Sequence, residues 1–141
     1  MSSPLIQNMI EQHGYPVLTQ QTLDDFAGAH EQVVLFFTEN PVKFPESNDV
    51  AMILPELVKA FAGRLDAAVI DQADQRKLQM RYGFSEWPAL VFLRDGDYLG
   101  AICRVQDWNT YLTQIQHILA SDVTRPPAFN IPVSGAADGC C

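Results

Sequence analysis

Short apolar runs alternate along the chain with segments in which apolar residues recur every three or four positions. The run at 33–37 is apolar without interruption, which is typical of a strand buried on both faces of a sheet. Asp95-Gly96 separates two further apolar runs and is a strong signal for a tight hairpin turn. An additional strand containing Pro16 is expected at a sheet edge, where proline is tolerated. The predicted strands are 15–19, 33–38, 66–71, 89–93 and 98–103.

Helical spacing predicts five helices between and around these strands. The second is expected to open with a capping box at Thr22 and Asp25, and the third to be kinked by Pro55. Asp107 is expected to cap the last helix and to place Trp108 and Tyr111 in the core. The predicted helices are 4–12, a short one opening at Thr22, one from 48 or 49 to 61, 73–82, and one from Asp107.

This order of elements predicts an α/β fold with a mixed sheet of four to five strands and helices on both faces. With 141 residues, of which 48% are hydrophobic, the chain is long enough for one domain with a substantial core. We expect that domain to span 1–121. Residues 122–141 are rich in proline, glycine and small polar residues, and they are expected to form a flexible tail.

The charge balance is acidic, with nine Lys and Arg against seventeen Asp and Glu, for a net charge of -8. Nucleic-acid binding needs a concentration of basic side chains, so nucleic acid is not an expected partner. No segment has the roughly 20 apolar residues of a membrane span, so no membrane insertion is expected. The first residues show neither early basic residues nor a signal-length apolar stretch, which predicts a cytoplasmic protein.

The three cysteines do not suggest a secreted disulfide framework. Cys103 lies in a predicted strand and is expected to be a small buried side chain without reactivity. Cys140 and Cys141 are adjacent near the end of the tail, and they lack the further ligands of a structural zinc site. The histidines are scattered and no nucleophile motif is present, so neither a metal nor a cofactor is expected.

The sequence resembles thioredoxin over about 15–120, in the buried strand at 33–37, the helix with an internal Pro55, and Trp87-Pro88 leading into a second buried strand. Counting back from Pro55, the positions of the thioredoxin Cys-x-x-Cys motif fall on Ser47 and Val50. Neither side chain forms the thiolate that disulfide exchange requires. The resemblance therefore implies a thioredoxin-like fold without its redox motif. It also implies a cis Trp87-Pro88 bond; the alternative is that Pro88 only shapes a turn.

Within the thioredoxin-like proteins, the chain is similar to the HyaE/HupG family of hydrogenase-operon accessory proteins. The similarity rests on Pro45-Glu46, Asn48-Asp49, Glu56-Leu57 and the stretch 82–100. It implies a non-enzymatic chaperone for maturation of an uptake nickel-iron hydrogenase, which binds the twin-arginine signal peptide of the small-subunit precursor before export. Other hydrogenase accessory proteins are a further class of partner that the resemblance suggests.

A twin-arginine peptide presents two guanidinium groups followed by an apolar segment, so a receptor needs carboxylates beside an apolar groove. The chain offers both near the missing redox motif and the Trp87-Pro88 turn. The alternative is that the acidic residues are only solvated and that the aromatic residues only pack against the rest of the protein. The candidate peptide-binding residues are Glu39, Phe44, Glu46, Asp49, Phe84, Glu86, Trp87 and Pro88.

Two other function classes stay open at the level of the sequence. The protein is an oxidoreductase if Cys103, Cys140 and Cys141 replace the lost motif, and an insulin-reduction assay with a triple Cys-to-Ser variant tests that hypothesis. It is a purely structural subunit of a hydrogenase-maturation complex if it does not bind the signal peptide directly. Pull-down with full-length and signal-deleted precursor separates that reading from the chaperone.

Overall fold

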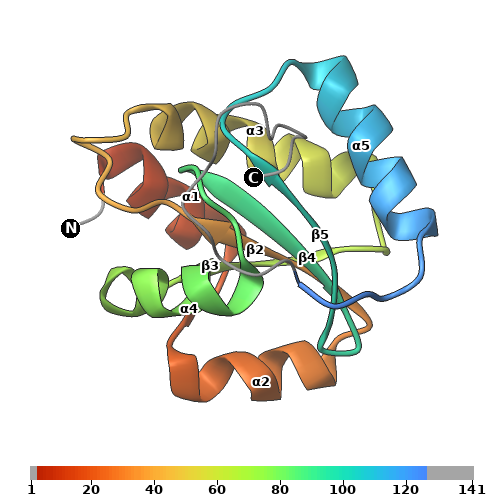
Figure 1. Cartoon of the computed structure of the whole chain (residues 1–141). Coiled ribbons are helices and arrows are strands. Elements are labelled where there is room, and N and C mark those ends of the chain that lie inside the picture. Colours follow the sequence, from red (N-terminus) through yellow and green to blue (C-terminus); the bar gives the residue numbers. More distant parts are fainter. Residues whose placement is uncertain (1–2, 127–141) are drawn as a thin grey trace, which may run out of the picture.

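Five strands form one mixed sheet in the computed structural model, which describes residues 3–126 (Figure 1). Their order across the sheet is β1-β3-β2-β4-β5, with β3 parallel to β1 and β2, and with β4 antiparallel to β2 and β5. The predicted mixed α/β sheet is confirmed. The edge strand is shorter than predicted. The strands are β1 (Val17–Leu18), β2 (Gln32–Phe37), β3 (Asp66–Ile70), β4 (Ala89–Arg94) and β5 (Asp97–Cys103).

Helices cover both faces of the sheet, with α1, α3 and α5 on one side and α2 and α4 on the other (Figure 1). Successive side chains of a strand point to opposite faces, so Val34 and Phe36 of β2 pack toward α1, α3 and α5, while Leu35 packs toward α2 and α4. Both faces are therefore apolar, which explains the uninterrupted run at 33–37. The helices are α1 (Pro4–His13), α2 (Gln20–Ala29), α3 (Glu46–Ala60), α4 (Gln75–Tyr82) and α5 (Trp108–Ala120), with a short 3-10 turn, η1 (Gln72–Asp74), before α4.

Three helix starts differ from the prediction, and the smallest difference is that α4 begins at Gln75 rather than at 73, after the 3-10 turn η1. The cap of α2 is Thr19, whose hydroxyl accepts from the Thr22 N–H while the Thr22 hydroxyl accepts from the Thr19 N–H. The capping box predicted at Thr22 and Asp25 was wrong by one turn, because a threonine here takes the reciprocal role that Glu usually plays. Helix α3 begins at Glu46 rather than at 48 or 49, directly after Pro45, whose backbone is already in the helical region.

The β4–β5 hairpin and the cap of α5 agree with the sequence. Asp95 and Gly96 both have positive φ, 51° and 86°, as the predicted tight turn requires. The Asp107 side chain accepts a hydrogen bond from the Thr110 N–H at 2.7 Å and caps α5.

The expected burial of Trp108 was wrong, whereas that of Tyr111 is confirmed. Trp108 is 42% exposed, and Tyr111 is fully buried. The buried side chains of α5 begin at Tyr111 and continue through Ile115 and Leu119. The apolar period extends into the first turn of the helix, but a side chain is buried only where another element covers it.

The chain stays close to the sheet for a few residues after α5. Arg94 of β4 donates to the carbonyls of Leu119 and Ser121 at the end of that helix, and the Thr124 N–H donates to the Tyr98 carbonyl at 2.9 Å. The predicted boundary between 121 and 122 stays a prediction, and most of the predicted tail lies outside the described residues. No helix within residues 3–126 is long and apolar enough to cross a membrane.

Candidate functional site

Three connecting segments meet at one end of the sheet: residues 38–45 between β2 and α3, residues 83–88 before β4, and residues 104–107 between β5 and α5. Together they form a pocket of about 420 Å³, which we call the Trp87 pocket. It is lined by Lys43, Phe44, Pro45, Glu46, Ser85, Glu86, Trp87 and Arg104.

Ser47 and Val50, the positions predicted from the sequence to correspond to the thioredoxin cysteines, are closed off from solvent. Ser47 is fully buried and Val50 is 1% exposed. The Ser47 hydroxyl donates to the Thr38 carbonyl at 2.6 Å, which joins the start of α3 to the residue after β2. Neither side chain lines the Trp87 pocket, so this part of the former redox region is now core.

A buried glutamine from α4 completes the polar interior beside Ser47. The Gln75 amide donates to the Ile70 carbonyl at 2.8 Å and to the Thr38 hydroxyl at 3.1 Å, and its oxygen accepts from the Glu39 N–H. Gln75 is 1% exposed. Because each of its polar groups is hydrogen-bonded, the glutamine joins α4 to β3 and to the segment directly after β2, without an unsatisfied buried group of its own.

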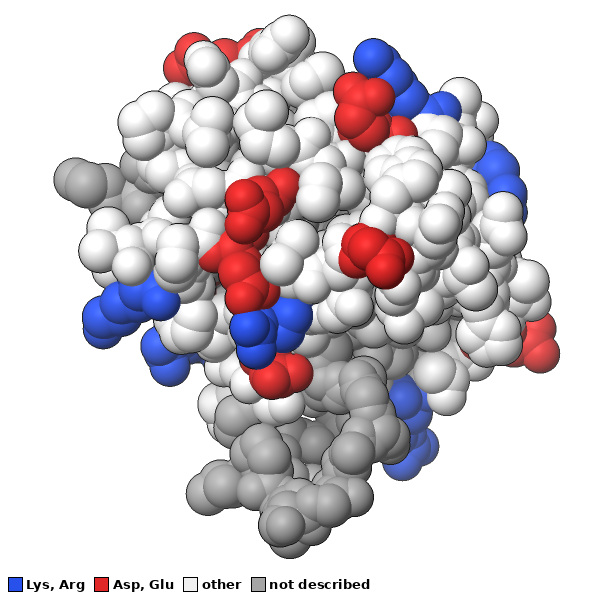
Figure 2. Space-filling model, turned by 90° about the horizontal axis from the view of Figure 1, so that it is seen from above, with Lys and Arg blue, Asp and Glu red and all other residues white. Residues whose placement is uncertain are grey.

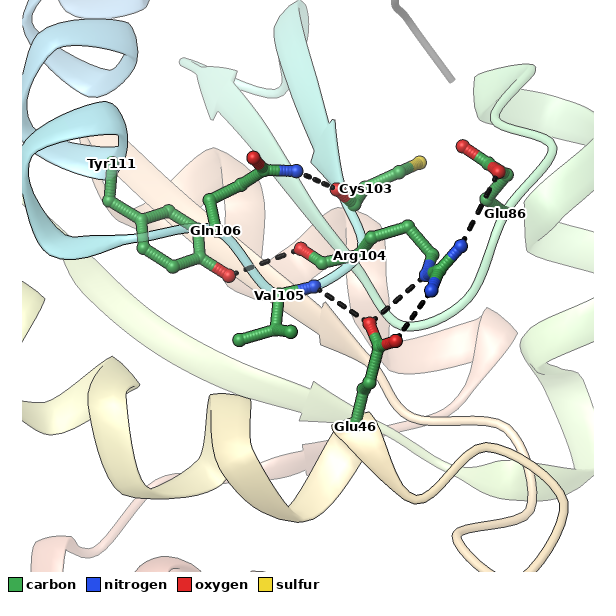
Figure 3. A network of polar contacts seen from close by, with 7 residues as sticks. All are labelled: Glu46, Glu86, Cys103, Arg104, Val105, Gln106 and Tyr111. Atoms are coloured by element: carbon green, nitrogen blue, oxygen red, sulfur yellow. Dashed lines mark hydrogen bonds and ion pairs between the residues drawn. The ribbon is translucent and has the colours of Figure 1, made fainter.

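Glu46, the first residue of α3, reaches the β5–α5 connection (Figure 3). Its carboxylate accepts two hydrogen bonds from the Arg104 guanidinium, from Nε at 3.0 Å and from Nη2 at 2.5 Å, and a third from the Val105 N–H at 3.0 Å. Glu86 lies on the other side of the same guanidinium, with Oε2 at 3.9 Å from Nη1. Arg104 thus lies between the two carboxylates that line the Trp87 pocket.

These contacts stabilise the ionised form of Glu46. The hydrogen bonds from the Arg104 side chain and then from the Val105 N–H hold the pKa of Glu46 below its usual value of 4.5. The position of the residue in the first turn of α3 also favours negative charge, since the helix N-terminus carries a partial positive charge. Glu46 is therefore a carboxylate at neutral pH.

The backbone of Arg104 is held by two hydrogen bonds, whereas its side chain is half exposed. Its φ is +64°, an uncommon conformation for a residue with a side chain. The Arg104 N–H donates to the Pro88 carbonyl at 2.7 Å, and the Arg104 carbonyl accepts from the buried Tyr111 hydroxyl at 3.2 Å. The Trp87-Pro88 bond is cis, as the resemblance to thioredoxin implied. The Arg104 side chain itself is 50% exposed.

The structure brings only two of the four predicted acidic residues into the pocket, Glu46 and Glu86. Glu39 pairs with Arg76 at 2.6 Å, and its side chain is only 13% exposed. Asp49 is exposed one turn into α3, outside the pocket lining. On the face covered by α3 and α5, acidic side chains form a short row that ends beside basic ones (Figure 2).

The predicted aromatic residues divide into a pocket wall and its support. Phe44 and Trp87 line the pocket, with ring centroids 6.4 Å apart. Phe84 is 1% exposed and packs edge-on against Trp87 at 5.0 Å, so it supports the wall and does not face the pocket. The Arg76 guanidinium lies 5.9 Å from the centre of the Trp87 ring. Pro88 is buried directly before β4.

Sequence reasoning missed the basic residues of the site. Arg104 is distant from Glu46 and Glu86 in the sequence and stands in no motif, so only its place directly after the predicted strand 98–103 hinted at this end of the sheet. Arg76 and Gln75 were missed for the same reason. Within residues 3–126 no cluster of three or more metal-ligating side chains occurs.

Cys103 is buried, as expected, but it is not a free thiol. It is 8% exposed at the end of β5, opposite Ala89 in the sheet register, and it is disulfide-bonded. Cys140 and Cys141 lie outside the described residues.

Comparison with known proteins identifies the family. Residues 5–111 match the family model of the hydrogenase-1 expression protein HyaE. The chain belongs to the HyaE family. Among its relatives, the hydrogenase expression/formation protein HoxO of Azotobacter vinelandii is 49% identical, over 96% of this chain and 92% of the relative. HupG of Bradyrhizobium diazoefficiens, also a hydrogenase expression/formation protein, is 39% identical over 78% of this chain and 77% of the relative.

Solved structures agree with this assignment and with the fold. The crystal structure of a putative HupG from Rhodopseudomonas palustris has a TM-score of 0.53 and 42% identity, and it covers 74% of this HyaE-family chain and 95% of that protein. A mutant thioredoxin from Halobacterium salinarum has a TM-score of 0.62 at 20% identity, covering 77% and 92%. The second comparison shows that the fold is thioredoxin-like.

Proposed function

We propose that this protein is a non-enzymatic chaperone that binds the twin-arginine signal peptide of a nickel-iron hydrogenase small-subunit precursor in the cytoplasm, before export. Membership of the HyaE family supports a role in hydrogenase maturation. The observation that supports the peptide-binding step is the Trp87 pocket, which is lined by two carboxylates, the half-buried Phe44 and the largely buried Trp87.

The chemistry of the pocket suits a guanidinium followed by apolar residues. Glu46 offers both carboxylate oxygens toward the pocket and already accepts two hydrogen bonds from one guanidinium. Arginine pairs with carboxylates through such paired contacts, which a lysine ammonium does not reproduce. The half-buried Phe44 supplies apolar surface for the segment after the arginines, and Trp87, which is only 7% exposed, forms the pocket wall behind it.

Calorimetric titration of the small-subunit signal peptide tests this proposal. Glu86 lines the pocket, and Asp49 lies outside the lining, one turn along α3 from Glu46. Both are exposed, so the double variant Asp49→Lys/Glu86→Lys changes the charge in and beside the pocket with little effect on folding. Charge reversal replaces attraction by repulsion, and we expect affinity to fall about tenfold or more. A peptide with both arginines replaced by glutamine is the ligand control.

The matched protein control is Asp25→Lys/Glu31→Lys, which makes the same change in net charge with two exposed residues in and after α2, on the opposite face of the sheet. It should keep most of the affinity of the wild-type protein. Equal affinities for the two double variants would remove the Trp87 pocket from consideration. Pull-down of full-length precursor, but not of signal-deleted precursor, distinguishes this chaperone role from a purely structural place in a maturation complex.

A thiol-disulfide oxidoreductase is the second candidate, because Cys103 is disulfide-bonded in the strand next to Pro88. Exchange requires a thiolate that attacks one disulfide sulfur and a thiolate that leaves, so it depends on the cysteines alone. Insulin reduction that disappears in the Cys103→Ser/Cys140→Ser/Cys141→Ser variant would favour this function. Equal precursor binding by the triple variant would favour the chaperone.

A further inference from the structure

We propose that Arg104 is an internal competitor for the Trp87 pocket: its guanidinium takes the place of a ligand arginine and is displaced when the peptide binds. This inference rests on the proposed function and adds a regulatory step to it. The observation behind it is that the side chain lies between Glu46 and Glu86, the two carboxylates that line the pocket (Figure 3).

The two halves of Arg104 are held differently, which allows the side chain to leave without disturbing the fold. Its N–H and carbonyl are tied to Pro88 and to the buried Tyr111 hydroxyl. Among the described residues 3–126, the partners of the guanidinium are exposed or partly exposed, since the side chains of Glu46 and Glu86 are 29% and 54% exposed. Exposed ion pairs contribute little to stability and exchange readily with other cations.

Glu46 remains in position when the guanidinium leaves. Its carboxylate still accepts from the Val105 N–H at 3.0 Å, and its backbone belongs to α3. An incoming arginine therefore meets an oriented carboxylate with two free acceptor sites. The exchange replaces one guanidinium by another at Glu46, so the carboxylate keeps a paired cation while the Arg104 side chain turns to solvent.

The test is calorimetric titration, at low ionic strength, of a synthetic peptide that carries two adjacent arginines followed by a run of leucine and alanine. Arg104→Gln removes the competing guanidinium and keeps the backbone contacts. Because an exposed ion pair of this kind is weak, we expect the variant to bind the peptide about two- to fivefold more tightly than the wild-type protein. Arg104→Lys keeps the charge without the paired contacts and should give an intermediate affinity.

The matched control is Arg81→Gln. Arg81 forms an exposed ion pair with Asp24 outside the Trp87 pocket, with one hydrogen bond at 2.8 Å, and its loss changes the net charge by the same amount. It should leave the affinity close to that of the wild-type protein. An equal gain in both variants would mean that the net charge, rather than competition, controls binding, and would overturn the inference.

The outcomes also separate this inference from the proposed function. If the wild-type protein binds and Arg104→Gln binds equally or more weakly, the competitor role is wrong and the chaperone function stands. If only Arg104→Gln binds, the competitor role is supported in its strongest form. If neither binds, both proposals fail. Thermal unfolding of each variant verifies folding, and Arg104→Lys provides the same comparison should Arg104→Gln fail to fold.

Discussion

Glu46 and Ser47 are consecutive residues at the start of α3, and they show two different ways in which polar groups are placed at this end of the sheet. Ser47 points inward, is fully buried and donates to the Thr38 carbonyl. Glu46 points outward to Arg104, with its side chain 29% exposed. The first contact is closed to any ligand, whereas the second lies in the wall of a pocket.

The difference determines which contacts can take part in binding. A buried polar group that loses its partner has no water to replace it, so the interior network of Ser47, Thr38 and Gln75 is expected to be rigid and structural. An exposed ion pair that opens is solvated at once, so the Glu46–Arg104 contact is exchangeable. The buried network of Ser47, Thr38 and Gln75 therefore stabilises the fold, whereas the exposed Glu46–Arg104 pair is the contact that a ligand can reach.

Gln75→Leu is expected to have the largest effect on stability, because it removes the buried hydrogen-bond network. The substitution leaves the Ile70 carbonyl, the Thr38 hydroxyl and the Glu39 N–H without their buried partner. We expect the free energy of unfolding to fall by about 3 kcal/mol, measured by urea denaturation.

The control for this variant is Gln79→Leu, one turn later on the same helix. Gln79 is also buried, at 7% exposed, but its side chain forms none of these hydrogen bonds. It should cost much less stability than Gln75→Leu. Comparable losses for the two variants would show that the glutamine side chains matter for packing and not for the interior network.

Ser47→Ala tests the same buried network and is expected to have a smaller effect on stability. It removes one hydrogen bond, 2.6 Å long, and leaves the Thr38 carbonyl without that donor. We expect a loss of about 1 kcal/mol in the free energy of unfolding, with unchanged affinity for the signal peptide, because Ser47 does not line the pocket. A large change in peptide affinity at constant stability would contradict the assignment of this position to the core.

The sequence predicted most of the fold because the core pattern is simple. The run at 33–37 is apolar on both faces, and Asp95-Gly96 and Asp107 stand at positions where turns and caps have strong residue preferences. The prediction of burial failed where contacts with other elements, rather than the local apolar pattern, determine which side chains are covered. Trp108 continues the apolar period of α5 yet is 42% exposed, because the buried part of that helix starts at Tyr111.

The candidate site was predictable only in part, for a related reason. Glu46, Glu86 and Trp87 flank segments with recognisable patterns, and the fold brings them to one pocket. Arg104 has no local signal, and its part in the site depends on a contact between residues 58 positions apart. Charge alone likewise failed to show that Glu39 is paired with Arg76 away from the pocket lining.

The smallest expected effect comes from Glu46→Gln. This variant tests how much the exposed Glu46–Arg104 contact contributes to stability at different pH values. The pKa of Glu46 is lowered in the folded protein by its hydrogen bonds from Arg104 and Val105, so its ionised form stabilises the fold above the usual value of 4.5. That contribution is lost as the pH falls through the lower, folded value. Urea denaturation from pH 7 to pH 3 should therefore show a small stability difference between wild type and variant that is constant near neutrality and disappears in acid. The same difference in an Arg104→Gln background should be smaller, because the main cause of the shift is gone; an undiminished difference would assign the stabilisation to the helix N-terminus and the Val105 N–H instead.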